Sequence, residues 1–207
     1  MPMRTLFYLC LILLAGCTSK IDHETIIAIQ PIGRLEAAKI ETIRAALVKQ
    51  YGARIIVLDS VAPPQSAFVN IKTPRYRADA LLTFLADIKP DSVDYIIGLT
   101  NYDISVSKKD ALGNIKKPES RYKDFGIFGL GRKPGSCCVV STFRLGNFSK
   151  PVPHSRLAKV SVHEIGHNLG LDHCTTPRCV MADAVEKMST VDNAAYTLCA
   201  QCSRKVL

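Results

Sequence analysis

Apolar residues occur along the chain in blocks whose spacing predicts secondary structure. Runs rich in β-branched and apolar residues predict strands at 25–33, 53–59 and 93–105, the second of them buried. Apolar residues at helical spacing predict helices over 35–51 and 77–88. This alternation of strands and helices is typical of an α/β fold, with a mostly parallel sheet and two helices packed on it.

The pattern changes in the second half of the chain. Residues 125–131 and 137–145 are two further strand candidates, separated by the short Pro-Gly turn RKPGS, which allows them to pair antiparallel. A long helix is predicted over 155–170. The remainder is expected to be irregular until a capping box, Ser189 with Asp192, which precedes a last helix that carries two cysteines.

The first apolar run predicts a signal peptide. One basic residue, Arg4, precedes an apolar stretch over 6–14 that is too short to span a bilayer. The small pair Ala15-Gly16 stands directly before Cys17, and this ending resembles the lipobox of bacterial lipoproteins. An ordinary secretory signal with a chance cysteine is the alternative interpretation.

The lipobox resemblance implies that residues 1–16 are removed and that Cys17 is acylated as the first mature residue. Residues 17–24 would then form a lipidated tether. The protein would be exported and lipid-anchored to the bacterial cell envelope, at the outer membrane or the periplasmic face if there are two membranes. The membrane is therefore an expected partner, through acylated Cys17.

Length and charge narrow the function classes. The chain has 207 residues, of which 47% are hydrophobic, as in one folded domain of ordinary size. Its formal net charge of +9 predicts a basic surface that is either merely solvated or attracted to anionic lipid headgroups. Nucleic acid is excluded as a partner, because an exported protein rarely meets it and no compact run of Lys and Arg appears.

Three of the five histidines fall within the segment SVHEIGHNLGLDHC. On a helix, His163 and His167 are about 40° apart around the axis and about 6 Å apart along it, so both imidazoles can face one ion. His173 could join them only if the helix breaks, and Gly170 permits a sharp exit because glycine adopts the left-handed conformation without strain. Three histidines would leave one zinc position open for water, and Glu164 is placed to take a proton from it. Coincidence on an amphipathic helix is the alternative, which the added glycine and third histidine oppose.

The spacing His163-Glu164-x-x-His167-x-x-Gly170-x-x-His173 is the metzincin signature. Four cysteines and a methionine downstream narrow the match to a resemblance to the archaemetzincin family. These residues are Cys174, Cys179, Met181, Cys199 and Cys202.

This resemblance implies a metzincin-type zincin fold, zinc peptidase chemistry, a Met-turn at Met181 beneath the catalytic ion and a second zinc held by the four cysteines. An upper subdomain with the active-site helix is predicted over 25–173, and a zinc-stapled C-terminal subdomain over 174–207.

In metzincins the antiparallel edge strand lines the cleft, and by chain order the resemblance assigns this role to residues 125–131. The candidate substrate-contacting residues there are Phe125, Gly126, Ile127, Phe128 and Gly129. The glycines leave backbone accessible, so that a peptide could add as a further strand. An ordinary edge strand weakened by glycine is an equally good interpretation.

The four C-terminal cysteines allow two interpretations. In an exported chain they could form two disulfides. Their arrangement as two close pairs, Cys-x₄-Cys and Cys-x₂-Cys, suits tetrahedral zinc instead, and we predict two zinc ions per chain and no disulfide among the four. Cys137 and Cys138 are adjacent in a predicted strand, face opposite ways and are predicted to be buried small apolar residues.

These patterns together predict a membrane-tethered zinc metallopeptidase that acts on peptide or protein substrates, with Glu164 as general base. The alternatives are a lipid-anchored zinc-binding protein with a latent or non-proteolytic site, and a metal-buffering lipoprotein. Glu164 favours the enzyme.

Overall fold

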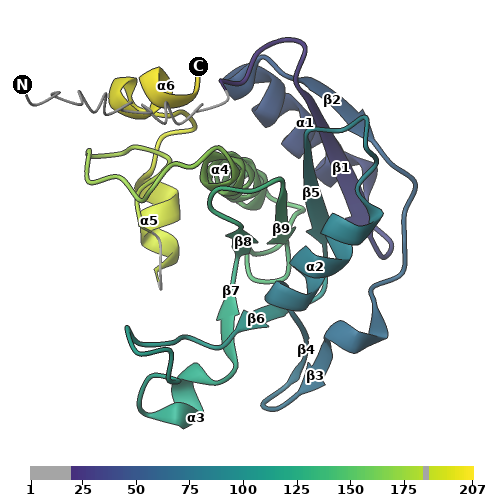
Figure 1. Ribbon diagram of the computed structural model, residues 1–207, viewed down its shortest axis with the longest axis vertical. Coiled ribbons are helices and arrows are strands. Elements are labelled where there is room, and N and C mark those ends of the chain that lie inside the picture. The colour runs from purple at the N-terminus through teal and green to yellow at the C-terminus, as the bar shows by residue number, and fades with distance from the viewer. Residues whose placement is uncertain (1–19, 184–186) are drawn as a thin grey trace, which may run out of the picture.

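A five-stranded sheet forms the centre of the computed structural model, which describes residues 20–183 and 187–207 (Figure 1). Its strands lie in the order β2 (Arg54–Val57), β1 (Ile26–Ile32), β5 (Tyr95–Thr100), β9 (Cys137–Ser141) and β8 (Gly129–Gly131). The first four are parallel, and β8 pairs antiparallel with β9. The predicted mixed, mostly parallel sheet with an antiparallel edge strand is confirmed.

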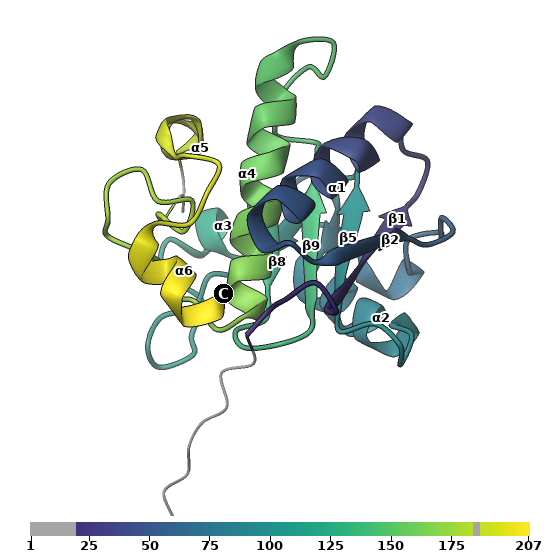
Figure 2. The same ribbon diagram turned by 90° about the horizontal axis from the view of Figure 1, so that it is seen from above.

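Helices cover both faces of this sheet (Figure 2). α1 (Ala37–Tyr51) and α4 (Pro151–Asn168) pack on one face, and α2 (Ala78–Ile88) packs on the other. Side chains of β9 alternate between the two layers, so that Cys138 lies on the α1 and α4 side and Cys137 on the α2 side. Both thiols are buried and free, as predicted.

A second, four-stranded sheet was not expected. It has the order β3 (Phe68–Asn70), β4 (Pro74–Arg77), β6 (Ile104–Val106) and β7 (Phe125–Ile127). A short 3₁₀ helix, η1 (Gln65–Ala67), precedes β3, and α3 (Glu119–Tyr122) lies between β6 and β7.

The second sheet divides two of the predicted strands. Residues 93–105 were predicted as one strand, but β5 ends at Thr100 and β6 begins at Ile104. The polar residues between them turn the chain: the Tyr102 N–H bonds to the Thr100 hydroxyl, and Asp103 is buried against two arginines. The predicted strand over 125–131 is likewise divided, because β7 pairs in the second sheet and β8 in the first.

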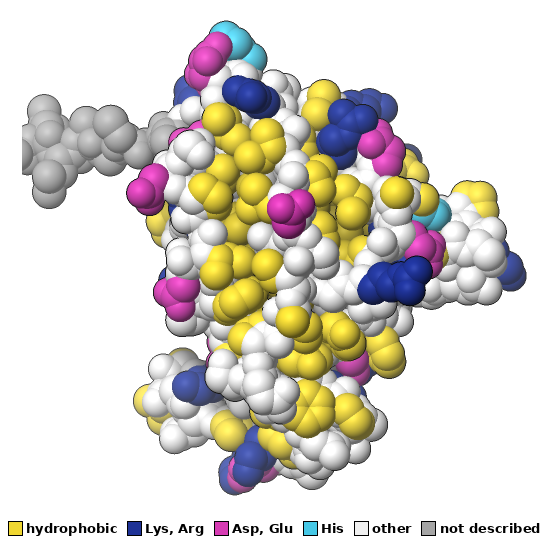
Figure 3. Space-filling model, turned by 90° about the vertical axis from the view of Figure 1, so that its right-hand side faces the viewer, with side chains coloured by type: hydrophobic (Ala, Val, Ile, Leu, Met, Phe, Trp, Pro, Cys, Tyr) yellow, Lys and Arg dark blue, Asp and Glu magenta, His cyan; other side chains and the backbone are white. Residues whose placement is uncertain are grey.

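The prediction that residues 53–59 form a buried strand was wrong. β2 lies at the edge of the sheet, and Val57 is 46% exposed. Figure 3 shows apolar side chains gathered on this side of the molecule, where β2, α2 and the loop between β2 and β3 lie. β2 is as apolar as a strand in the middle of a parallel sheet. Its composition alone therefore does not reveal that it lies at the edge.

The helix ends also differ from the predictions. α4 begins at Pro151 rather than Ser155, as suits proline in a first helical turn. The last segment forms two short helices, α5 (Met188–Asn193) and α6 (Ala200–Val206), and the predicted capping box is wrong. The Asp192 carboxylate instead accepts two hydrogen bonds from Arg156 on α4, at 2.7 and 2.8 Å.

The folded body begins before residue 25, earlier than predicted. Ile21 is 5% exposed and its N–H donates to the Val206 carbonyl at 2.9 Å, so the chain is already part of the core at this residue. Cys17 and the predicted signal lie outside the described residues. Among the described helices, none combines the length and apolarity needed to cross a bilayer.

Candidate active site and zinc centres

Three histidines converge at the C-terminal end of α4. The rings of His163 and His167, one helical turn apart, have centroids 4.6 Å apart. Gly170 takes a φ of +89°, and the chain reverses there as the Leu171 N–H bonds to the Gly166 carbonyl at 2.9 Å. This exit brings the His173 ring to 4.9 Å from that of His167.

Hydrogen bonds fix which imidazole nitrogen faces the common centre. Nδ1 of His163 donates to the Val180 carbonyl at 2.8 Å, and Nδ1 of His167 donates to the Leu171 carbonyl at 2.8 Å. Because carbonyl oxygens only accept, both Nε2 atoms are left as acceptors. One possible metal-ligand atom from each of the three histidines lies within 4.8 Å of the other two. Three such ligands fit zinc and leave a fourth position for water.

Burial keeps the imidazoles of His163 and His167 neutral. Burial, followed by the nearby His167, lowers the pKa of His163 to about 4. Burial also lowers the pKa of His167. Neutral imidazole is the form that binds a metal. His173 is more exposed, and its Nδ1 lies 3.7 Å from the Asp183 carboxylate, which can orient the ring.

Glu164 lies between α4 and the edge strand β8. A β-carbon at Gly129 would come within 2.7 Å of its Oε1, and one at Gly131 would come within 2.7 Å of its backbone oxygen. The glycines therefore let the strand approach the helix, a steric role that differs from the accessibility predicted for them. Burial raises the pKa of Glu164 to about 8, opposed by a hydrogen bond from the Gly131 backbone.

Met181 lies directly under the active-site helix. It is fully buried, and a β-carbon at Gly166 would come within 2.4 Å of its sulfur. Gly166 stands between the two helical histidines in sequence, so Met181 packs at the level of the predicted metal. Met181 therefore packs against the helix that carries His163 and His167.

A cleft with a volume of about 910 Å³ runs past the three histidines and Glu164. Residues 125–131 all line it. β7 and β8 are each the last strand of their sheet, and the chain leads directly from one into the other (Figure 1). Both short strands, with the bend at Phe128 between them, therefore lie along the wall of the cleft.

The four C-terminal cysteines form a separate cluster. One sulfur from each lies within 4.8 Å of the others, and the pairs Cys174–Cys199 and Cys179–Cys202 are 3.8 and 3.9 Å apart. Zinc–sulfur bonds of about 2.3 Å in a tetrahedron place sulfurs about 3.8 Å apart, whereas a disulfide joins them at about 2.05 Å. The donor set therefore fits zinc.

The charge state of these thiols also favours a cation among them. The Cys202 N–H lowers the pKa of Cys199 to about 6, and hydrogen bonds from Thr176 lower that of Cys174. Burial raises the pKa of both Cys179 and Cys202. Cys174 and Cys199 are thus the thiols that ionise more readily, and a bound zinc ion would deprotonate the other two as well.

Sequence reasoning missed three residues that organise this region. The Tyr51 hydroxyl donates to the Val162 carbonyl of α4 at 2.7 Å, and the Asn168 amide donates to Arg132 and Cys137 carbonyls, tying the β8–β9 hairpin to the helix. Arg144 lines the cleft near Gly126. Only Asn168, a polar residue among apolar ones beside His167, could have been singled out.

Comparison with known proteins agrees with this geometry. The model of peptidase family M54 matches residues 37–207. The archaemetzincin of Halobacterium salinarum is 29% identical over 187 residues, which cover 86% of this chain and 97% of that protein. The archaemetzincin of Methanopyrus kandleri is 30% identical over 140 residues, covering 68% of this chain and 70% of that protein.

Solved structures have the same fold. The crystal structure of the Archaeoglobus fulgidus archaemetzincin complexed with malonate has a TM-score of 0.70 and 26% identity, covering 88% of this chain and 100% of that one. That of the Methanopyrus kandleri protein also has a TM-score of 0.70, at 24% identity, covering 93% and 96% of the two chains. The chain therefore belongs to peptidase family M54, the archaemetzincins, and is a zinc metallopeptidase.

Proposed function

We propose that His163, His167 and His173 hold a catalytic zinc and that Glu164 is the general base for peptide hydrolysis. The observation that carries this proposal is the position of Glu164, held between the histidine-bearing helix and the cleft-lining edge strand. A zinc ion bound there supplies a Lewis acid that polarises the peptide carbonyl and acidifies a water.

The protein groups around it then perform the proton transfers. Glu164 takes a proton from the attacking water and passes it to the leaving amine. Its burial raises its proton affinity, which helps it to accept the first proton, while a neighbouring divalent charge favours the carboxylate form beforehand. Backbone groups of β7 and β8 offer the substrate an open edge to pair with as a further strand.

A second zinc, bound by Cys174, Cys179, Cys199 and Cys202, is part of the proposal. Its role is structural, because four protein ligands leave no open position. His173 precedes Cys174 directly, and the Cys174 N–H bonds to the Met181 carbonyl at 2.8 Å. The cysteine site would thereby hold both the third histidine and the Met181 turn in place.

Export and lipid anchoring through Cys17 are also proposed, from the lipobox resemblance. The early packing of Ile21 leaves three residues between Cys17 and the folded body, which would then work close to the membrane surface. Fractionation of cells expressing the full chain tests this: Cys17→Ser should abolish acylation and release the protein from membranes. Continued labelling of this variant by a fatty-acid probe would reject lipidation.

A lipid-anchored zinc-binding protein with a latent site, or a metal buffer, would retain both sets of ligands without turnover. Metal analysis of residues 20–207, together with digestion of a peptide library, separates these functions. The peptidase should contain two zinc ions per chain and cleave peptides. A metal buffer should exchange its zinc readily and cleave none.

A further inference from the structure

One end of the cleft, beyond the catalytic residues, contains a fixed guanidinium. The Arg144 side chain lies under the backbone of β7, so close that a β-carbon at Gly126 would come within 2.3 Å of its Cζ and Nη2. Both residues line the cleft, and the Arg144 side chain retains 32% exposure. Because residue 126 is a glycine, the Arg144 side chain has room in the wall of the cleft.

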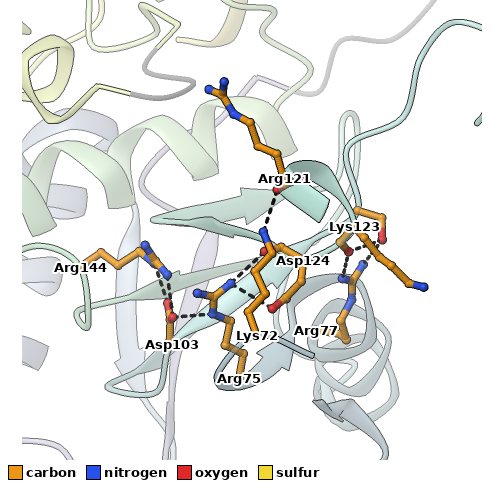
Figure 4. Close-up of polar contacts among 9 residues, drawn as sticks. Lys72, Arg75, Arg77, Asp103, Arg121, Lys123, Asp124 and Arg144 are labelled. Carbon is orange, nitrogen blue, oxygen red and sulfur yellow. Dashed lines mark hydrogen bonds and ion pairs between the residues drawn. The ribbon is translucent and has the colours of Figure 1, made fainter. Parts of the chain in front are cut away.

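Buried carboxylates hold this guanidinium in place (Figure 4). Arg144 donates from Nε and Nη2 to the two oxygens of Asp103, at 2.6 and 2.7 Å. Asp103 also accepts a bond from Arg75 at 2.8 Å, and Arg75 in turn donates to Asp124 at 3.0 Å. Asp103 and Asp124 are 5% and 1% exposed, so the alternating chain is rigid and Arg144 is oriented before any ligand arrives.

Part of the binding capacity of Arg144 is unused. Among the described residues none accepts a hydrogen bond from its Nη1. The Arg144 side chain is also partly exposed to the cleft, so its guanidinium can accept a further anionic partner there.

The position of Arg144 along the cleft determines which residue of a bound peptide would carry that anionic group. Gly126 precedes Gly129, which lies against Glu164, by three residues with a bend at Phe128, so the two glycines are at most about 10 Å apart. Antiparallel pairing is the more stable of the two ways in which a peptide can add to β8. A peptide bound in this way runs, from its N-terminus to its C-terminus, from the catalytic residues toward Gly126. Its second or third residue after the cleaved bond then lies beside Arg144.

We propose that Arg144 is a specificity-determining residue that binds a carboxylate of the peptide substrate, two or three residues C-terminal to the cleaved bond. This inference rests on the proposed function of the Glu164 site. The carboxylate is either an acidic side chain, in a longer substrate, or the C-terminal carboxylate of a substrate that ends there.

Matched peptides test the proposal on the zinc-loaded wild-type protein. One pair has Glu or Gln at the second and third positions after the cleaved bond, and a second pair ends there with a free carboxylate or an amide. We expect kcat/KM to be about tenfold or more higher for the charged member of at least one pair, the usual scale of a charge-assisted hydrogen bond. The pair that shows the difference identifies the source of the carboxylate.

Arg144→Gln should remove this preference, so that the charged and uncharged members of a pair are cleaved with equal kcat/KM. Arg77→Gln is the matched control, because Arg77 bonds to Asp79, Ser107 and the Lys123 carbonyl and does not line the cleft. The control should retain the preference. If Arg144→Gln does not fold, the wild-type comparison alone decides.

Equal cleavage of charged and uncharged peptides by the wild type would overturn the role of Arg144 and leave the peptidase assignment intact. A preference for acidic residues on the N-terminal side of the cleaved bond would also overturn it. Failure to cleave any peptide would overturn the proposed function, and this inference with it.

Discussion

The Glu164 carboxylate lies against the backbone of Gly129, and a β-carbon at this glycine would come within 2.7 Å of Oε1. The contact joins the active-site helix α4 to the cleft-lining strand β8, two elements that are separated in sequence by β9 and its flanking loops. The strand thus determines where the proposed general base lies.

Gly129→Ala should therefore reduce kcat/KM by about 10- to 100-fold, because displacing a catalytic group by about 1 Å costs on this order. The three atoms nearest to a β-carbon at this position all belong to Glu164, so the zinc content should not change. In a Glu164→Gln background, Gly129→Ala should lower kcat/KM only slightly further, because the carboxylate that it displaces is already absent. Full activity of Gly129→Ala would show that the contact does not position Glu164.

His173→Ala should lower the affinity of the catalytic site for zinc by more than about 100-fold, because even loss of an outer partner of a metal ligand costs 10- to 100-fold. Competition with a chelator measures this affinity. His23→Ala is the control, because that side chain is 84% exposed and lies outside the cluster. An unchanged affinity in His173→Ala would mean that His173 is not a ligand.

Cys199→Ser or Cys202→Ser should lower the metal content by about one ion per chain and reduce the thermal stability, because structural zinc contributes folding energy directly. Cys137→Ala should leave the metal content unchanged, since that thiol is buried in the sheet away from the cluster. Mass measurement under non-reducing conditions that found two disulfides and a single zinc would contradict the second site.

The convergence of the three histidines could be predicted from the sequence because its geometry is local. His163 and His167 share one helical face, and Gly170 supplies the only kind of exit that returns His173 to them. The central sheet was equally predictable, since each of its parallel strands alternates with a helix or lies in a continuous apolar run.

Features set by contacts distant in sequence could not be predicted. Residues 93–105 divide into two strands because Asp103 bonds to Arg75 and Arg144, 28 and 41 positions away. The exposure of Val57 depends on β2 being the outermost strand, which the sequence of β2 does not state. The steric need for Gly129 depends on the register of β8 with β9, which brings this glycine to Glu164.

Glu164→Gln tests the central claim most directly, when peptide turnover and zinc content are measured on the same preparation. Glutamine keeps the shape of the side chain but cannot accept the proton from water, so turnover should fall by at least about 100-fold, the usual scale of general acid-base catalysis. The fold and both zinc ions should remain. Near-normal turnover in this variant, with zinc still bound, would contradict the role of Glu164 as the general base.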